Sequence, residues 1–553
     1  MICTLLSWVV IGTSAFLWGT AILSFLEKFN HYEEKKLDMV LMTGLCALTV
    51  YAQFFSLFRR VNRAAFMSVI FADAIIVILI KGKMKCWLRK FRNMEKDVFK
   101  YRFFAIVGIG ILVAGFASGE VRHYDTALYH AQAIHWIEEY GVVPGLGNLH
   151  NRLAYNSSFL PLQALFSLKF LTGQSLHSMN GFIMWLLLSY ALCSMRFWHR
   201  NRIYSSDFLR IIIILYYAGK VRHISSPETD AFALGLTAYI FSKWVNLIED
   251  GEKNIAPYAY LCILGVYGVS LKLSMTMVVF LVLFPALKLV TGKRWKEIAL
   301  YLGFGIVTVM PFLIRNVIIS GYLLYPYPEI DLFPVDWKMP AASLIRDRNE
   351  IKVWAWNLCD VAKADAPFSV WFPVWRENMG RTDYMLFVIN IALVPICLCV
   401  GGYQVLKEKR WEFLHISGCM ISCMVFWFFT APLARYGKVF LYLLPFYAIG
   451  TLLGRAREGR MIVIAMAAWE ICCIISLLKG INVNFKHVII CADYALWECN
   501  PTDIGGLQIY IPETGDQTGY YDFPSTPYKS VLEQIELRGG SFSEGFRPYP
   551  AER

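Results

Sequence analysis

The chain has 553 residues, of which 57% are hydrophobic, 16% aromatic and only 17% charged, and its mean hydropathy is +0.47. This composition excludes an ordinary soluble protein, which would aggregate, and is typical of a polytopic membrane protein. The formal net charge of +12 does not indicate nucleic-acid binding, because the basic residues lie in short segments between apolar runs, as positive-inside bias predicts.

Apolar runs long enough to span a bilayer recur along almost the whole chain, without the period-two alternation of a membrane barrel. We therefore predict an all-α polytopic membrane protein with about fourteen transmembrane helices. The first run is expected to be a retained span, because no basic region or cleavage site marks a signal peptide. The expected spans are residues 4–26, 37–58, 64–80, 101–119, 178–195, 207–219, 231–248, 256–271, 273–290, 298–314, 384–405, 412–430, 439–454 and 461–479.

Basic connections between the runs predict the orientation of these spans. The stretch KGKMKCWLRKFRNMEKDVFKYR carries nine Lys or Arg against two acids and is expected on the cytoplasmic side. Counting spans from it places RRVNR (59–63) and three longer segments outside: 120–177, 315–383 and 480–553. The expected divisions are extra spans with a basic loop in 1–100, a transmembrane core in 101–480, and a small polar outer-face tail in 481–553.

Two short apolar stretches in the first outer segment, AQAIHWIEEY (131–140) and FLPLQALFSLKFLTG (159–173), are expected to lie flat in the membrane interface. The second is too short to span and contains a proline and a lysine. In the first we expect Ile134, Trp136 and Ile137 to face lipid, and Glu138 and Glu139 to face water.

The first outer segment carries a long motif, YDTALYHAQAIHWIEEYGVVPGLGNLHNRLAYNSSFLPLQALF. Three later pieces accompany it: SSPETDAFA at 225–233, FLIRNVIISGYLLYPYP at 312–328 and TAPLARYG at 430–437. Together these resemble the GT-C glycosyltransferases, a superfamily that includes protein O-mannosyltransferases and aminoarabinose transferases, and more closely a group of uncharacterised bacterial multi-pass proteins. The resemblance covers about residues 101–460; the first three spans and the tail lie outside it.

This resemblance implies a GT-C-like core that transfers a sugar from a polyprenyl-phosphate donor to a glycan or lipid acceptor at the outer face of the bacterial cytoplasmic membrane. It implies that Asp125 is the catalytic base; a carboxylate just beyond a span end can have a raised pKa suited to proton abstraction. The alternative is an Asp that caps the following helix. Many members of the superfamily carry paired acids in this loop, whereas Asp125 is accompanied only by Glu120.

Basic residues on the outer side are exceptions to positive-inside bias and are candidates for phosphate binding. Snorkelling toward the interface is the alternative for each. His130 and Asp230 are added as substrate-binding candidates. The predicted cations are Lys220, Arg222, Lys272, Arg315 and Arg435.

Other features leave alternatives open. His123, His130 and His135 could bind a divalent metal, but their spacing disfavours it, so no cofactor is predicted with certainty. The segment KVWAWN…FSVWFPVW could stack on an acceptor sugar or form an interfacial Trp belt. Cys491 and Cys499 could form a disulfide in an extracytoplasmic tail. A lipid-linked glycan transporter, or flippase, and a glycan polymerase are the competing functions.

Overall fold

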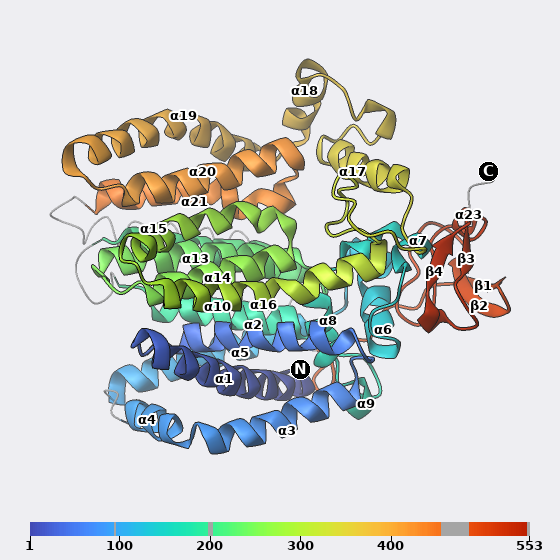
Figure 1. Cartoon of the computed structure of the whole chain (residues 1–553), viewed down its shortest axis with the longest axis horizontal. Coiled ribbons are helices and arrows are strands. Elements are labelled where there is room, and N and C mark those ends of the chain that lie inside the picture. The colour runs from blue at the N-terminus through green and yellow to red at the C-terminus, as the bar shows by residue number, and fades with distance from the viewer. Residues whose placement is uncertain (93–95, 197–202, 455–485, 550–553) are drawn as a thin grey trace.

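The computed structural model describes residues 1–92, 96–196, 203–454 and 486–549 as a bundle of helices lying side by side, with a small tail that contains short strands (Figure 1). The helices before residue 200 are α1 Ile2–Asn30, α2 Leu37–Ser56, α3 Arg63–Leu79, α4 Lys81–Arg92, α5 Lys96–Ala117, η1 Thr126–His130, α6 Ala131–Glu139, α7 Leu146–Leu149, η2 Asn151–Tyr155, α8 Phe159–Leu165, α9 Lys169–Thr172 and α10 Met179–Cys193. The later helices are α12 Ser205–Lys220, η3 Val221–His223, α13 Asp230–Glu249, α14 Ala256–Leu271, η4 Leu273–Val282, α15 Leu283–Thr291, α16 Trp295–Ser320, α17 Ala341–Ala355, η5 Val361–Lys363, α18 Phe368–Asn378, α19 Arg381–Tyr403, η6 Gln404–Glu408, α20 Glu412–Thr430, α21 Ala434–Leu453, α23 Lys529–Leu532 and η7 Phe542–Glu544.

The chain is a polytopic membrane protein by the length and composition of its helices. Within the described ranges, eight helical segments are long and apolar enough to cross a bilayer, or nine if the pair α3 and α4, bent by 79°, is one span. Helices occupy every described range in which a span was expected, but several are too short for this criterion, so fourteen spans are not reached. The expected span at 461–479 lies outside the described residues.

The bundle has two different ends. The segments 120–177, 321–380 and 486–549 gather at one end, which we call the loop end, and the basic helix α4 lies at the other (Figure 1). The tail touches the first segment directly, since the Phe546 N–H donates to the Pro144 carbonyl at 3.0 Å. The turn at 59–62 belongs to this end too, because the Val61 N–H donates to Ile137 O at 2.9 Å.

Small residues allow the first two helices to pack closely. A Cβ on Gly44 of α2 would lie 1.7 Å from the Ala15 carbonyl oxygen of α1, and one on Gly19 would lie 1.9 Å from the Val40 carbonyl oxygen. Only glycine fits at either position. Such close backbone contact is how helices associate in lipid, where apolar side chains gain little from burial.

The first outer segment does not lie flat on lipid as expected. Ile134, Trp136 and Ile137 are 2%, 0% and 3% exposed, and the tail covers Trp136. The Trp136 ring lies 5.0 Å from that of Phe523, 6.1 Å from that of Phe542 and 6.0 Å from that of Phe546, between ring centroids. These three side chains were therefore placed wrongly.

The predicted exposure of other residues in this segment is also wrong in part. Glu138 was expected in water but is buried, and it accepts hydrogen bonds from the hydroxyls of Ser175 and Tyr520. The stretch 159–173 is not one surface helix: every residue of α8 is buried, whereas α9 has no buried residue and exposes Phe170 and Leu171. Glu139 does lie near the surface, 4.0 Å from Arg60.

The tail consists of two antiparallel strand pairs. β1 (Cys499–Ile504) pairs with β2 (Leu507–Pro512), and β3 (Ile535–Leu537) pairs with β4 (Phe546–Pro548). The first pair turns at Gly505 and Gly506, both with positive φ, as a two-residue hairpin requires. Cys491 and Cys499 are free thiols, so the disulfide that the sequence allowed is absent.

The tryptophans of the large outer segment pack against one another. Trp356 and Trp371 are stacked with centroids 4.8 Å apart, and the Trp375 indole donates to the Pro432 carbonyl at 2.6 Å. All three side chains are buried. These three form a small core with α18 and are not available to a sugar or to lipid, whereas Trp354 of α17 is 58% exposed, so both alternatives stay open for that residue.

Candidate active site

The candidate site is built from helix ends that meet at the loop end. Asp125 immediately precedes the π-helix η1, Glu228 and Asp230 lie at the start of α13, and Lys272 follows the last residue of α14. Arg435 lies in the first turn of α21. Because these helices end at the same end of the bundle, residues distant in sequence come together there.

Arg435 is the centre of this cluster. Its Nη2 donates to Asp125 Oδ2 at 3.0 Å, and its Nη1 lies 3.2 Å from His123 Nε2. Its Nε lies 3.8 Å from Asp230 Oδ2. One guanidinium therefore connects the first outer segment to the start of α13.

Two lysines extend the cluster. Lys272 forms an ion pair with Asp230, and its Nζ lies 4.0 Å from the centre of the Tyr436 ring. Lys220 donates to both carboxylate oxygens of Glu228 at 2.9 Å, and His123 Nε2 lies 3.3 Å from Glu228 Oε2. Each of these cations is thus neutralised by a neighbouring carboxylate.

The protonation state of the Asp125 carboxyl is set by its neighbours in the cluster. Burial pushes the pKa of its carboxyl upward, but nearby positive charge, above all that of Arg435, outweighs burial, so the pKa lies below its ordinary value. The expectation of a raised pKa is therefore wrong, because the arginine was not visible as a partner. Only Oδ2 is engaged; within the described residues Oδ1 accepts no hydrogen bond. The carboxylate is ionised at neutral pH and has one free oxygen.

His123 and His130 are neutral at physiological pH. Burial lowers the pKa of His130 to about 3 and also lowers that of His123. The His130 ring lies 4.2 Å from the Tyr129 ring, and within the described chain neither of its nitrogens has a hydrogen-bond partner. His135 instead meets the tail, with Nδ1 2.9 Å from the Tyr520 carbonyl oxygen. The described residues hold no group of three His, Cys, Asp or Glu arranged for a metal.

Two of the predicted cations do not join the cluster. Arg315 is 3% exposed and donates to Asn156 Oδ1 at 2.9 Å and to the Ser56 hydroxyl. It points into the bundle from α16, and no acidic side chain in the described ranges lies within ion-pair distance of it. Arg222 lies on η3 with an exposed side chain, beside His223.

A short turn connects Arg315 to the cluster. The Asn156 amide donates to Phe312 O at 3.1 Å and to Asn316 Oδ1 at 2.8 Å, both on α16. The next two residues bind the end of α14: the Ser157 hydroxyl donates to Leu271 O at 2.7 Å, and the Ser158 N–H donates to Ser270 O at 2.9 Å. The turn 156–158 thus holds together the helix ends that carry Lys272 and Arg315.

Sequence reasoning missed Arg152 of η2 and Asp347 of α17. Arg152 lies close enough to both Asp125 and Asp347 to lower their pKa values, yet it forms no ion pair within the described residues. Asp347 accepts from the Asn151 amide at 2.7 Å and the Tyr155 hydroxyl at 3.3 Å. Arg152 is a cation within the quoted motif, on the side predicted to face outward, so the positive-inside argument could have found it; nothing in the sequence marks Asp347.

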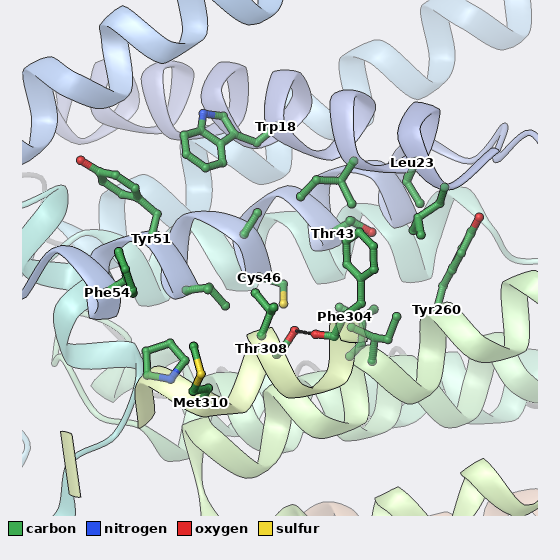
Figure 2. Close-up of a pocket in the computed structure, with 18 residues that line it drawn as sticks. Trp18, Leu23, Thr43, Cys46, Tyr51, Phe54, Tyr260, Phe304, Thr308 and Met310 are labelled. Atoms are coloured by element: carbon green, nitrogen blue, oxygen red, sulfur yellow. Dashed lines mark hydrogen bonds between the residues drawn. The ribbon is translucent and has the colours of Figure 1, made fainter. Parts of the chain in front are cut away.

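An apolar cavity lies along the bundle, from Leu26 and Tyr260 in the half away from the loop end to Phe54 and Pro311 nearer to it. It has a volume of about 380 Å³ and is lined by α1, α2, α14 and α16; Figure 2 shows Trp18, Cys46, Phe304 and Met310 among its walls. The lining residues Phe54, Val307 and Met310 are exposed on the bundle surface, so the cavity opens sideways. The lining residue Pro311 lies one helical turn before Arg315, which places Arg315 at the cavity's loop-end side.

Comparisons with known proteins identify a family. A search of curated proteins and a search of solved structures each give no match. The family model described as a domain of unknown function, DUF8201, matches residues 1–442, a range that includes Asp125, Asp230, Lys272 and Arg435 and stops before the tail. The chain therefore belongs to the DUF8201 family.

Proposed function

We propose that the chain is a membrane glycosyltransferase that moves a sugar from a polyprenyl-phosphate donor to a glycan or lipid acceptor. The observation that carries this proposal is the Asp125–Arg435 pair, a partly exposed carboxylate held at 3.0 Å among further cations at one end of an apolar helix bundle. The sideways-opening apolar cavity, whose lining reaches toward the same end at Phe54 and Pro311, supports a substrate with a long hydrocarbon chain. The resemblance of the first outer segment to GT-C enzymes supports the reaction class.

Asp125 is assigned the role of general base. In the proposed step the acceptor hydroxyl oxygen bonds to the anomeric carbon of the sugar, and the bond from that carbon to the phosphate oxygen breaks. The acceptor's proton passes to the unengaged Oδ1 of Asp125, and the phosphate leaves with the bonding electrons. Arg435 fixes the carboxylate through Oδ2 and holds it ionised, which prepares it to receive a proton.

Arg152 is the best-placed residue for the leaving phosphate. Lys220, Lys272 and Arg435 are each held by a carboxylate, whereas Arg152 has no ion pair in the described part of the chain. A guanidinium offers bidentate hydrogen bonds that suit a phosphate. Lys272 and Arg315 flank the turn 156–158 on helices that also line the cavity, so a chain in the cavity would bring its headgroup toward them.

The competing transporter reading predicts charges at mid-depth along a pathway. The structure places Lys243 2.7 Å from Asp38 near the opposite end, and Asp73 of α3 accepts from Ser14 and Trp18. These isolated groups form no chain toward the loop end among the described contacts. We therefore keep the transferase, with the loop end outside the cytoplasmic membrane, as the proposal.

Purified protein in nanodiscs should be tested with a panel of polyprenyl-phosphate sugars and mixed glycan and glycolipid acceptors. The proposal predicts transfer by the wild type and a loss of about 100-fold to 10,000-fold for Asp125→Asn, the range expected when a general base is removed. Asp331→Asn, an exposed acid of the same end that pairs with Lys338, is the matched control. Normal transfer by Asp125→Asn, or no transfer by the wild type with any donor, would refute the proposal.

A further inference from the structure

A segment of the tail, residues 516–523, lies along the helix that begins at Asp125; we call it the strap. The N–H groups of Thr518 and Gly519 both donate to the Ala127 carbonyl at 2.9 Å. Ala127 is only two residues beyond Asp125. The strap therefore makes direct backbone contact with the turn that carries the proposed base, although the two are almost 400 residues apart in sequence.

The π-helical turn explains why this contact is needed. In η1 the Ala131 N–H bonds to the Thr126 carbonyl, one residue further back than an α-helix would place it. A π-turn followed by an α-helix leaves a carbonyl without its usual partner, and such turns frequently occur at functional sites. The two strap N–H groups satisfy the Ala127 carbonyl at this point.

Side chains continue the contact along one face of α6. The Gln132 amide donates to the carbonyls of Gly519 at 3.2 Å and Asp522 at 2.9 Å. The His135 ring stacks on Tyr520 with centroids 4.3 Å apart, and the Tyr520 hydroxyl donates to Glu138. The spacing of these α6 residues follows one helical face, so the strap holds the helix over its full length.

The strap also holds the other side of Asp125. Tyr124 donates a hydrogen bond to Asp516, and the Gln517 amide donates to the Tyr124 carbonyl at 3.0 Å. Tyr124 immediately precedes Asp125, so contacts exist on both sides of the proposed base. Nothing in the strap touches the Asp125 carboxylate itself.

We propose that the strap is a positioning element of the active site, which fixes the π-turn so that the Asp125 carboxylate faces Arg435. This inference rests on the proposed transferase function. It assigns a catalytic purpose to the tail, which lies beyond the residues that the family model matches. A positioning role means that loosening the strap should slow the chemical step more than donor binding.

Gly519→Ala is the principal test. Gly519 has φ +71°, and a Cβ there would lie 2.5 Å from the Trp497 ring, so the substitution should displace the strap. Gly506→Ala is the matched control: it has φ +85° in the β1–β2 turn, where a Cβ meets open space. Gln132→Ala loosens the same contact from the α6 side without altering the tail.

Two measurements should be made on full-length protein in nanodiscs: amide hydrogen exchange of peptides covering residues 120–131, and the steady-state kinetics of sugar transfer. We expect exchange in this region to accelerate about tenfold or more in Gly519→Ala and Gln132→Ala, but not in Gly506→Ala. We expect kcat to fall about 100-fold in the first two while the donor KM changes less than about twofold.

The outcomes separate the inference from the function on which it rests. If the wild type transfers sugar but loosened straps leave kcat unchanged, or if exchange at 120–131 is unaffected, the positioning role is wrong. If the wild type transfers no sugar, the proposed function fails; accelerated exchange would then still support the strap as the element that fixes the Asp125 turn, and unchanged exchange would overturn that too.

Discussion

Two carboxylates at the loop end, Asp125 and Asp347, have pKa values that shift in opposite directions. Asp125 pairs with Arg435 at 3.0 Å, and its pKa lies below the ordinary value even though burial opposes this. Asp347 is 1% exposed and accepts from the neutral donors Asn151 and Tyr155, and burial raises its pKa to about 6 despite the nearby Arg152. Burial raises the pKa of both carboxyls, and the shifts are opposite because Asp125 alone has a cation within hydrogen-bond distance among the described residues.

The comparison separates two roles. Asp125 is charged, partly exposed and held on one oxygen, as a proton acceptor in a site would be. Asp347 anchors α17 of the large outer segment to η2 through Asn151 and Tyr155, and its carboxylate lies deeper. We therefore assign chemistry to the first carboxylate and assembly of the loop end to the second.

Removing the Arg435 guanidinium should have the largest effect on the difference between Asp125 and Asp347. In Arg435→Gln the pKa of Asp125 should rise, because burial is no longer opposed, and the acid limb of the pH–rate profile should move to higher pH. Transfer should fall about 100-fold, the cost of losing a preorganised charged donor. The pH dependence of kcat/KM in the purified variant measures both effects. An unchanged acid limb would show that Arg435 does not control Asp125.

Arg152 lies between the two carboxylates and tests the assignment of phosphate binding. Arg152→Gln should raise the donor KM about tenfold with little change in kcat, since one charge-assisted hydrogen bond is worth about 1.5–3 kcal/mol. Initial rates over a range of donor concentrations measure this effect. Arg346→Gln is the control, because Arg346 is an exposed arginine of α17 that pairs only with Glu350 in the described structure. A donor KM that stays the same in both variants would remove Arg152 from the site.

Substitution of Asp347 should change the stability of the protein more than the rate of sugar transfer. Its folded pKa of about 6 lies above the ordinary value of 3.8, so the folded state holds the proton more tightly than the unfolded state. Its contribution to stability is therefore largest at low pH and is lost as pH rises from about 4 through about 6. The difference in Tm between the wild type and Asp347→Asn should shift by a few degrees across this window. A pH-independent difference would mean that Asp347 does not titrate there.

Counting spans along the sequence predicted which residues lie at the same end of the bundle. The membership of the cluster could therefore be predicted in large part from the sequence. Asp125, Asp230, Lys272 and Arg435 each lie at the end of an apolar run, so the alternation of runs places them at one depth. Depth does not determine the direction of a side chain around its helix. Arg315 shows this limit: it lies at the expected depth but turns toward Asn156 and Ser56.

Sequence patterns did not predict where the tail, residues 486–549, packs on the bundle. Its polar composition suggested an outer appendage, and α6 showed an amphipathic pattern typical of a helix on lipid. Trp136 of α6 instead packs against Phe523, Phe542 and Phe546, and Glu138 is buried against Tyr520. An apolar face predicts burial but not the partner, and that partner lies almost 400 residues away in the chain.

The most direct test of the central claim compares single-turnover sugar transfer by Asp125→Asn and Asp347→Asn under identical conditions. If the Asp125–Arg435 pair is the catalytic centre, the chemical step should slow about 100-fold or more in Asp125→Asn and remain within about tenfold of the wild type in Asp347→Asn. Equal rates for Asp125→Asn and the wild type, or a larger loss for Asp347→Asn, would contradict it.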